Sequence, residues 1–350
     1  MPRGNSRTGF ERSAKRRQQL FRDASPTVSG QGRRPADDKG MRNPHLLAVG
    51  CELDNLYPGI RGEGGAIDFF ARRGIKWWKS SRSGDDTKTD GPTRNMASSQ
   101  VACVNFLLPL AGIPGALLEV LRALDEDVAC IENISHDENE SDVEFEWIGC
   151  GHSLEGGSTR GAQNTSIDAF LVVVTAAGRR RAYLLEWKYV EQYLSTRPHF
   201  MGEGSQGDTR RQRYAERYRA SFSSFNLDVA PDLDDFLYEP FYQIMRQRLL
   251  ADRMVQNGEL GIDEAKVVVV VPQENWAYRT VSDGRTTTSP LLTRRFPELE
   301  TVEAVMRASL KDPDAQFDMV APSSLLDSVS RSLPDETAEW AGYWRERYGV

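Results

Sequence analysis

The sequence predicts a mixed α/β fold: a mixed central sheet flanked by helices, with extra elements at both ends of the chain. Two apolar segments, 166–175 and 181–190, are joined by AAGRR, a short glycine-containing connection typical of an antiparallel hairpin. The run AKVVVVVP at 265–272 is β-branched throughout, as in a strand covered on both faces. A long amphipathic helix at 236–257 separates the hairpin from this strand, so we expect antiparallel and parallel pairing in one sheet.

The N-terminal part of the chain divides into a tail and the start of a domain. Residues 1–44 mix basic residues with Gly, Pro and Ser, and we expect a largely disordered tail with one helix around 9–23. From 45 to 350 we expect a single elaborated domain. Within it, 66–78 predicts a short helix followed by an aromatic pair, and the polar stretch 80–95 predicts a loop.

The remaining elements follow from periodicity and from helix-capping signals. Ser98 is a suitable N-cap, Gly112 with Pro114 breaks the helical region that it begins, and Gly258 ends the long helix. We expect the catalytic core at about 96–275. In chain order we expect a helical region at 96–124, followed by three strands at 142–149, 166–175 and 181–190. Two helices at 209–222 and 236–257 lead to a strand at 265–272. The C-terminal part has helices at 297–310, 323–332 and 335–348, with a strand at 316–320.

Composition sets the class of protein. Hydrophobic residues make up 39% of the chain and charged residues 27%, which is ordinary for a soluble globular protein. No run of about 18 apolar residues occurs, so we expect no membrane span. The N-terminus lacks the apolar stretch of a signal peptide. We therefore expect a cytoplasmic protein.

Four cysteines lie far apart, without a CxxC pair and without clustered histidines: Cys51, Cys103, Cys130 and Cys150. Zinc sites need ligand pairs close together on a loop or turn, and this spacing does not supply them. The arrangement also does not suit an iron–sulfur cluster. We expect reduced, mostly buried thiols.

The charge is unevenly distributed. The net charge is −7, but residues 1–44 hold eleven Lys or Arg against four Asp or Glu, which makes this segment +7 and the remainder −14. An acidic body does not exclude DNA binding where the site itself is cationic or is bridged by a divalent metal. The basic segment is either an arm for phosphates or a partner, or a tail without a defined role.

Three charged residues on the predicted hairpin are the main chemical signal. Asp168 opens the apolar strand IDAFLVVV, and LLEWKYV places Glu186 and Lys188 two residues apart. Side chains alternate faces along a strand, so Glu186 and Lys188 project together, and the hairpin brings Asp168 beside them. Carboxylates are the ligands that Mg²⁺ takes, and a lysine nearby can stabilise a hydroxide or a phosphate. This grouping suits phosphodiester hydrolysis.

An isolated E-x-K is a weak signal, because a salt-bridging pair at a strand end has the same pattern. The context favours function: these charges interrupt otherwise apolar strands, where an unpaired charge is costly and needs a metal or a partner. A suitably spaced aspartate also begins the preceding strand.

Asp168 followed by Glu186-Trp187-Lys188 resembles the PD-(D/E)xK nuclease superfamily, whose restriction-endonuclease-like core runs αβββαβ. The chain is more specifically similar to a bacterial family of restriction-endonuclease-like nucleases. Ile167 stands where the superfamily's name has proline, as in many members. The likeness spans roughly 66–275 and rests on DFFARRGIKWW (68–78), SSQVACVNFLLPL (98–110), VEFEW (143–147), SIDAFL (166–171), LLEWKYVEQY (184–193) and YEPFYQIMRQRLLADRM (238–254).

The resemblance implies roles for the motif residues. Asp168 and Glu186 are expected to bind Mg²⁺, for which Mn²⁺ substitutes, with the backbone carbonyl of Trp187 as a further ligand. Lys188 is the expected catalytic lysine. The superfamily often has one more glutamate, and Glu146 is our choice because its strand neighbours the site. Glu144 on the same face and Glu119 on the preceding helix are the alternatives, and a solvated strand glutamate is the alternative reading of Glu146.

Several further residues are expected to support the site or to contact DNA, each with a plainer alternative. Gln243 and Gln247 lie one turn apart on the long helix, where packing and surface polarity are the alternative. Gln100 suits helix capping or a DNA contact, and Tyr189 supports the lysine. A basic segment is the internal choice for phosphate contacts, with a solvated helical face as its alternative; it includes Arg210, Arg211 and Arg213.

The sequence therefore predicts a Mg²⁺-dependent nuclease acting on DNA, in restriction, phage defence or repair. The alternative is a catalytically silent nucleic-acid-binding or structural subunit on a nuclease fold. RNA as the substrate, endonucleolytic or exonucleolytic action, and a homodimer stay open. No membrane partner is expected.

Overall fold

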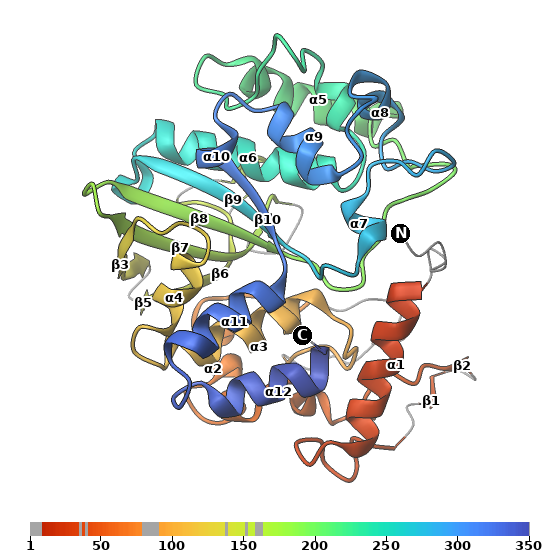
Figure 1. The fold of residues 1–350 in the computed structure, drawn as a ribbon, viewed down its shortest axis with the longest axis vertical. Helices are drawn as coiled ribbons and strands as arrows, with labels where there is room; N and C mark the ends of the chain where they lie inside the picture. Colours follow the sequence, from red (N-terminus) through yellow and green to blue (C-terminus); the bar gives the residue numbers. More distant parts are fainter. Residues whose placement is uncertain are drawn as a thin grey trace. The chain divides into compact units, whose positions relative to one another are not determined.

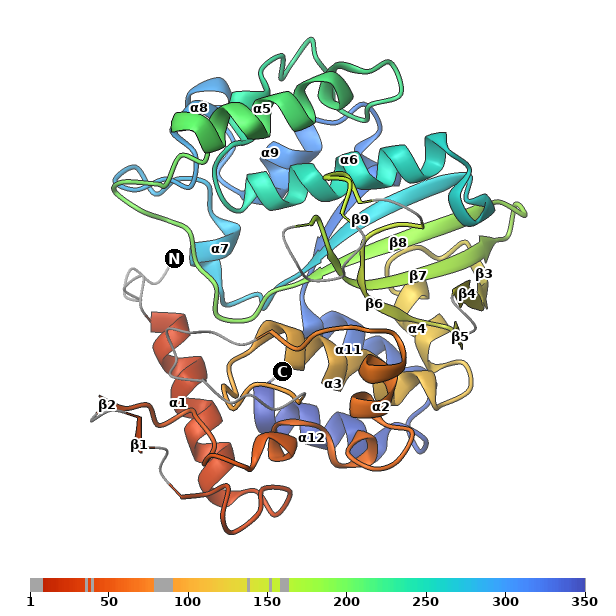
Figure 2. The ribbon, with the colours of Figure 1, turned by 180° about the vertical axis from the view of Figure 1, so that it is seen from behind.

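The computed structural model describes residues 9–34, 37–38, 41–78, 91–136, 139–150, 153–157 and 164–349. Figures 1 and 2 show its ribbon from two sides. The chain forms two compact units. The first comprises Met1–Phe145, Trp187–Val190 and Ala321–Val350, and the second comprises Glu146–Glu186 and Glu191–Val320. Most of the predicted loop 80–95 lies outside the described residues.

The first unit is largely helical. Its helices of the α type are α1 (Gly9–Ala24), α2 (Ala66–Arg72), α3 (Ser99–Ala111), α4 (Ala116–Arg122), α11 (Pro322–Ser332) and α12 (Ala338–Tyr348), with 3-10 turns η1 (Glu52–Asn55) and η2 (Pro58–Ile60). Its strands are β1 (Asp37–Asp38), β2 (Met41–Arg42), β3 (Val128–Glu132), β4 (Ile134–His136) and β5 (Asn139–Ser141). Ser98 caps α3 as predicted, its side chain accepting a hydrogen bond from the Val101 N–H.

The helix predicted around 9–23 within the N-terminal tail is observed at residues 9–24. They form helix α1, which packs against α12 near the other end of the chain. Gln18 is fully buried on this face, and the Phe21 side chain is buried beside it. The helix is amphipathic, and charged residues cover its outer face.

A buried arginine fixes α1 to the rest of the first unit. The Arg347 guanidinium donates to the Asn55 carbonyl at 2.6 Å, to Gln18 Oε1 at 3.1 Å and to the Met96 carbonyl at 3.3 Å. Gln18 Nε2 in turn donates to the Arg347 carbonyl at 2.9 Å. A buried charge is tolerated where such hydrogen bonds satisfy it, so this network ties together segments that are distant in sequence.

The second unit holds the sheet. Its strands are β7 (Ile167–Thr175), β8 (Arg180–Trp187, whose last residue belongs to the first unit), β9 (Glu264–Val270) and β10 (Phe317–Val320). Strand β6 (Glu144–Trp147) crosses the boundary between the two sequence ranges. The helices and 3-10 turns are α5 (Gly204–Arg219), η4 (Leu233–Phe236), α6 (Phe241–Gln256), η5 (Glu259–Gly261), α7 (Trp276–Arg279), α8 (Pro290–Arg295), α9 (Val302–Ala308) and α10 (Pro313–Gln316).

The sheet is mixed, as predicted. Its strands run in the order β10-β9-β8-β7, and β6 also pairs with β7. Strands β7 and β8 are antiparallel, whereas β9 and β10 are parallel. Gly178, at φ +76°, makes the tight hairpin turn possible. The valines of β9 are fully buried, and α6 packs on this strand (Figure 2), which explains the continuous β-branched run.

The predicted strands 142–149 and 181–190 are longer than the observed ones. Strand β6 ends at Trp147, and Gly149 beyond it adopts φ +94°, outside the extended region. Glu146, within the strand, has φ +49°. Strand β8 ends at Trp187. Strands β3, β4 and β5 had no sequence prediction, because each is only three to five residues long and none alternates apolar with polar residues.

None of the helices in the described ranges is by itself long and apolar enough to cross a bilayer. Helices α3 and α4 together have the length and apolar composition of a membrane span, but the chain bends by 120° between them. The four cysteines are free thiols. Cys51 and Cys103 are buried as expected, whereas Cys150 is half-buried and Cys130 is exposed.

Candidate active site

The hairpin places the two predicted metal-binding carboxylates opposite each other within the second unit. The last pair in the register is Ala169 with Leu185, and continuing it by one residue sets Asp168 opposite Glu186. Residues directly opposite on antiparallel strands point to the same face, with Cβ atoms about 4.5–5.5 Å apart. Glu186 has no exposed surface, whereas Asp168 is half-buried. Two like charges at this separation repel each other unless a cation or a proton lies between them.

Helix α6 holds Glu186 from the facing layer. Gln243 Nε2 donates to Glu186 Oε1 at 2.5 Å, and Gln247 Nε2 donates to Glu186 Oε2. The two glutamines are one helical turn apart, so their amides reach the two oxygens of one carboxylate. The structure thus brings both predicted glutamines to the motif glutamate, where they fix its orientation.

Gln247 also carries an oxygen atom with unsatisfied hydrogen-bonding capacity. Its side chain is 1% exposed, and within the described residues its Oε1 has no hydrogen-bond partner. A buried acceptor without a partner costs about 1–3 kcal/mol. This oxygen belongs to the same amide that donates to Glu186, so the unmet acceptor lies beside the carboxylate pair.

Glu146 lies next to the start of β7. Its side chain is 2% exposed, and its Oε2 accepts a hydrogen bond from Ser166 Oγ at 2.6 Å. Ser166 is two residues before Asp168, so the third predicted carboxylate is near the first. The φ of +49° at Glu146 is rare for a residue with a side chain and is typical of functional sites.

The two alternative glutamates are engaged elsewhere in the first unit. Glu144 forms an ion pair with Arg73 at 2.7 Å, and both side chains are buried. Glu119 accepts hydrogen bonds from Arg122 Nη1 at 3.0 Å and from Ser332 Oγ at 2.7 Å. These contacts give both residues a structural role.

Over the described ranges, no group of three or more His, Cys, Asp or Glu side chains is arranged to hold a metal by itself. A magnesium site at the hairpin is compatible with this finding, because such a site needs fewer protein ligands. Mg²⁺ is commonly bound by one or two carboxylates, with waters and substrate phosphates completing the shell. The opposed pair Asp168 and Glu186 and the unmet oxygen of Gln247 fit such a site.

Lys188 follows β8 by one residue and lies in the first unit, buried with 8% exposure. Its neighbours are firmly packed there. Trp187 packs on Phe106, with ring centroids 5.0 Å apart. Tyr189 packs edge-on against Tyr348 at 5.3 Å and accepts a hydrogen bond from Gln18 Nε2 at 2.9 Å. Burial raises the pKa of Tyr189, so the phenol stays protonated and the segment around Lys188 is held by aromatic contacts.

Gln100 is buried in the first unit and contacts the backbone. Its Oε1 accepts from the Trp78 N–H at 2.9 Å, and its Nε2 donates to the Lys76 carbonyl at 3.4 Å. These bonds hold the segment after α2.

The arginines of α5 differ from one another. Arg210 lies over the Tyr242 ring at 5.7 Å and donates to the Met201 carbonyl. Arg211 donates to both oxygens of Asp234, at 2.8 and 2.9 Å. Arg213 is exposed. Of the three, Arg213 has the side chain most accessible to a phosphate.

One cluster at the edge of this site had no sequence prediction. Glu155 accepts hydrogen bonds from Thr165 Oγ1 and from Tyr214 OH, both at 2.6 Å. Arg246 lies 3.9 Å from Glu155 Oε1 and over the Tyr242 ring. Burial alone raises the pKa of Glu155, but the hydrogen bonds from Thr165 and Tyr214, with Arg246, lower it below its ordinary value.

This cluster draws on three segments that are separate in sequence. The only local signal was the position of Arg246 between Gln243 and Gln247 on α6. Thr165 directly precedes Ser166, the residue that holds Glu146. The cluster thus places a half-buried cation, Arg246, near the residues that hold Glu146.

Comparison with known proteins gives a family. A family model described as "Restriction Endonuclease associating with ARP" matches residues 76–349. No curated protein and no solved structure matches the chain. The matched range contains Glu146, Asp168, Glu186 and Lys188, and it begins after α1.

Proposed function

We propose that this chain, which belongs to the family described as Restriction Endonuclease associating with ARP, is a metal-dependent nuclease that hydrolyses phosphodiester bonds in DNA. The observation that carries the proposal is the opposed pair Asp168 and Glu186, with Glu186 held at both oxygens by Gln243 and Gln247. A buried carboxylate of fixed orientation with a second carboxylate opposite it is suited to a divalent cation.

The carboxylates of Asp168 and Glu186, with the backbone carbonyl of Trp187, are the proposed ligands of Mg²⁺, for which Mn²⁺ substitutes. A bound Mg²⁺ supplies polarisation of the phosphate and a lower pKa for its water. Gln243 and Gln247 keep the Glu186 carboxylate oriented toward α6, because both amides donate to it from that helix. The Glu186 carboxylate therefore needs little rearrangement when a metal ion binds.

Lys188 and Glu146 have the proposed catalytic roles. Lys188 follows Glu186 by two residues and comes directly after the end of β8, and its ammonium is suited to stabilise the attacking hydroxide and the phosphate. Glu146, held by Ser166, is suited to orient the attacking water or to accept its proton. A proton acceptor works from hydrogen-bond distance, and Ser166 limits the positions that the Glu146 carboxylate can take.

The test is cleavage of plasmid, linear DNA and RNA by the purified chain, with Mg²⁺, with Mn²⁺ or with EDTA. We expect cleavage of DNA with either metal and none with EDTA. Asp168→Asn, Glu186→Gln and Lys188→Met are each expected to lose about 10²-fold or more in rate, as for loss of a group that stabilises transition-state charge. Glu298→Gln, at an exposed position of the second unit, is the matched control and keeps the wild-type rate. Metal-independent cleavage, or full activity of Lys188→Met, contradicts the proposal.

A second candidate is a catalytically silent subunit that binds nucleic acid or supports an assembly. The association named in the family description favours it. The two candidates differ in one outcome: the silent subunit binds DNA equally well with Mg²⁺ or EDTA and cleaves none of the three substrates.

A further inference from the structure

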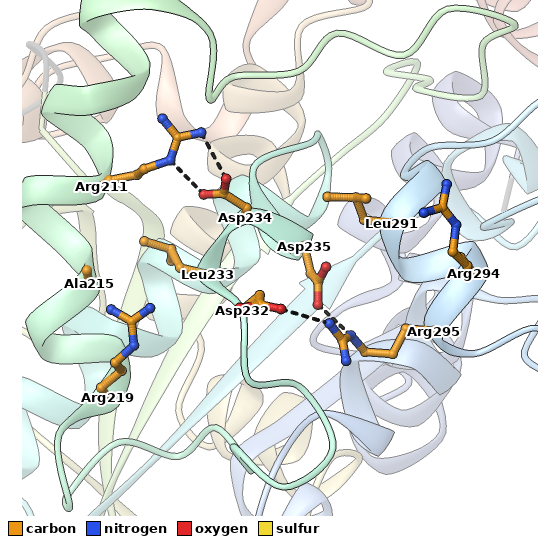
Figure 3. A pocket seen from close by; sticks show the side chains of 10 residues that line it. All are labelled: Arg211, Ala215, Arg219, Asp232, Leu233, Asp234, Asp235, Leu291, Arg294 and Arg295. Atoms are coloured by element: carbon orange, nitrogen blue, oxygen red, sulfur yellow. Dashed lines mark hydrogen bonds and ion pairs between the residues drawn. The ribbon is translucent and has the colours of Figure 1, made fainter.

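A cavity of about 770 Å³ opens in the second unit between α5, η4 and α8. Figure 3 shows side chains from these elements pointing into it. Its volume falls within the range of about 300–1,000 Å³ that small-ligand sites occupy. The lining residues are Arg211, Ala215, Arg219, Asp232, Leu233, Asp234, Asp235, Leu291, Arg294 and Arg295.

Two of the four arginines in this cavity are held by its three aspartates. Arg211 donates to both oxygens of Asp234, and Arg295 donates to Asp235 at 2.5 Å and to Asp232 at 3.2 Å (Figure 3). Asp235 is buried, and its pKa is raised mainly by that burial, although Arg295 opposes the rise. These ion pairs form a fixed framework for the cavity.

The other two arginines are available. Arg219 at the end of α5 and Arg294 on α8 are exposed, and in the part of the chain that the structure describes neither forms a hydrogen bond or an ion pair. Figure 3 shows them on opposite sides of the cavity. Two unpaired guanidiniums at one opening are suited to contact two phosphates, because each presents several N–H donors in a fork.

Apolar and acceptor groups lie between these cations. Ala215, Leu233 and Leu291 give the cavity aliphatic surface. The aspartate oxygens are acceptors for exocyclic amino groups of bases. A small inorganic anion gains from the arginines but also faces three carboxylates, so the combination favours a ligand with both phosphates and bases.

We propose that this cavity binds an unpaired stretch of a nucleic-acid strand, with phosphates on Arg219 and Arg294 and a base against Leu233 and Leu291. A duplex is too wide to enter a cavity of this volume, whereas a single-stranded nucleotide fits. The inference deepens the proposed nuclease function by naming a strand-binding site apart from the carboxylate pair, and it rests on that function for its biological role.

The test is fluorescence anisotropy in EDTA with a labelled single strand of about 16 nucleotides, the upper end of site sizes for single-strand binding domains, and with its duplex. We expect Arg219→Ala/Arg294→Ala to bind the single strand about 10- to 25-fold more weakly at roughly 100 mM salt. The slope of log affinity against log salt should fall by about 1.4, because each lost phosphate contact on a single strand removes about 0.7.

Two comparison variants separate the cavity from general charge. Arg285→Ala/Arg331→Ala removes the same charge at exposed positions and is expected to change neither affinity nor slope. Ala215→Trp fills the cavity without changing charge, and it is expected to weaken single-strand binding while the salt slope stays unchanged. Thermal melting checks that every variant is folded.

Three outcomes overturn the inference: no single-strand binding by the wild-type chain, an equal loss for single strand and duplex in Arg219→Ala/Arg294→Ala, or full competition by millimolar inorganic phosphate. EDTA prevents metal-dependent cleavage, so binding is readable whether or not the chain is a nuclease. A chain that binds the strand here but never cleaves DNA fails only the proposed catalysis.

Discussion

At the scale of single residues, the carboxylate of Glu186 depends on its two glutamine partners. Both of its oxygens accept from side-chain amides of α6, and Gln247 is buried with one oxygen unmet. Partners that orient a metal ligand are often worth 10–100-fold in metal affinity. The glutamines therefore belong to the proposed site as much as the motif residues do.

Gln247→Ala is expected to weaken Mn²⁺ binding by about 10-fold or more, because Glu186 loses a donor that fixes its orientation. Gln256→Ala, at an exposed position of the same helix, is the control and keeps the wild-type affinity. Calorimetric titration with Mn²⁺ measures both. Equal affinities in the two variants would assign Gln247 to packing alone.

Glu146 combines a buried carboxylate with a left-handed backbone conformation. Glu146→Ala and Glu146→Gly both remove the carboxylate, but only glycine relieves the strain at φ +49°. We expect Glu146→Gly to be more stable than Glu146→Ala by about 1 kcal/mol and both to lose cleavage activity. Urea unfolding measures the difference, and a less stable glycine variant would show that the site is not strained.

At the scale of elements, α1 is a structural part of the first unit. Its residue Gln18 satisfies both the guanidinium and the carbonyl of Arg347, and it donates to Tyr189 beside Lys188. A helix that lies outside the matched family range thus stabilises the segment that carries the proposed catalytic lysine.

Gln18→Ala is expected to lower the free energy of unfolding by about 2–3 kcal/mol, because it leaves buried groups of Arg347 without partners. Gln19→Ala, one residue along on the same helix and only partly buried, is the control and changes stability by less than about 0.5 kcal/mol. Urea unfolding followed by tryptophan fluorescence measures both variants. Similar values would mean that α1 contributes little to the unit.

Burial against α1 also predicts a pH dependence through His45. Burial, with Lys15 and Arg22 nearby, lowers the pKa of His45 to about 4 from 6.5. The unfolded chain then binds a proton between these values while the folded chain does not, so stability is full above pH 6.5 and is lost as the pH falls toward 4.

Protonation of His45 is expected to lower the free energy of unfolding by about 2–3 kcal/mol between pH 6.5 and pH 4. His45→Gln is expected to abolish this pH-dependent decrease. Urea unfolding at several pH values gives the comparison. A variant with the same pH slope as the wild type would show that other groups cause the loss.

At the scale of the whole molecule, local patterns predicted the order of the elements but not the contacts that join distant segments. The β-branched run at 265–272, the hairpin around Gly178 and the amphipathic helix α6 each have a periodicity or turn signal, and each is observed. The opposition of Asp168 and Glu186 follows from that hairpin.

The missed features are long-range polar contacts. Glu155 meets Tyr214 across 59 residues, and Gln18 meets the Arg347 carbonyl across 329 residues. Hydrogen bonds of this kind depend on how distant segments pack together. Such packing produces no periodic pattern of residues from which it could be predicted. The packing of α1 on α12 was missed for the same reason, although the helix itself was predicted around 9–23.

The central claim is that Asp168 and Glu186 form a divalent metal site, and Mn²⁺ binding followed by electron paramagnetic resonance tests it most directly. We predict saturable Mn²⁺ binding by the wild-type chain, a loss of affinity of about 10-fold or more in Asp168→Asn and in Glu186→Gln, and no loss in Glu298→Gln. Absence of saturable binding by the wild-type chain, or equal affinity in all four proteins, would contradict the claim.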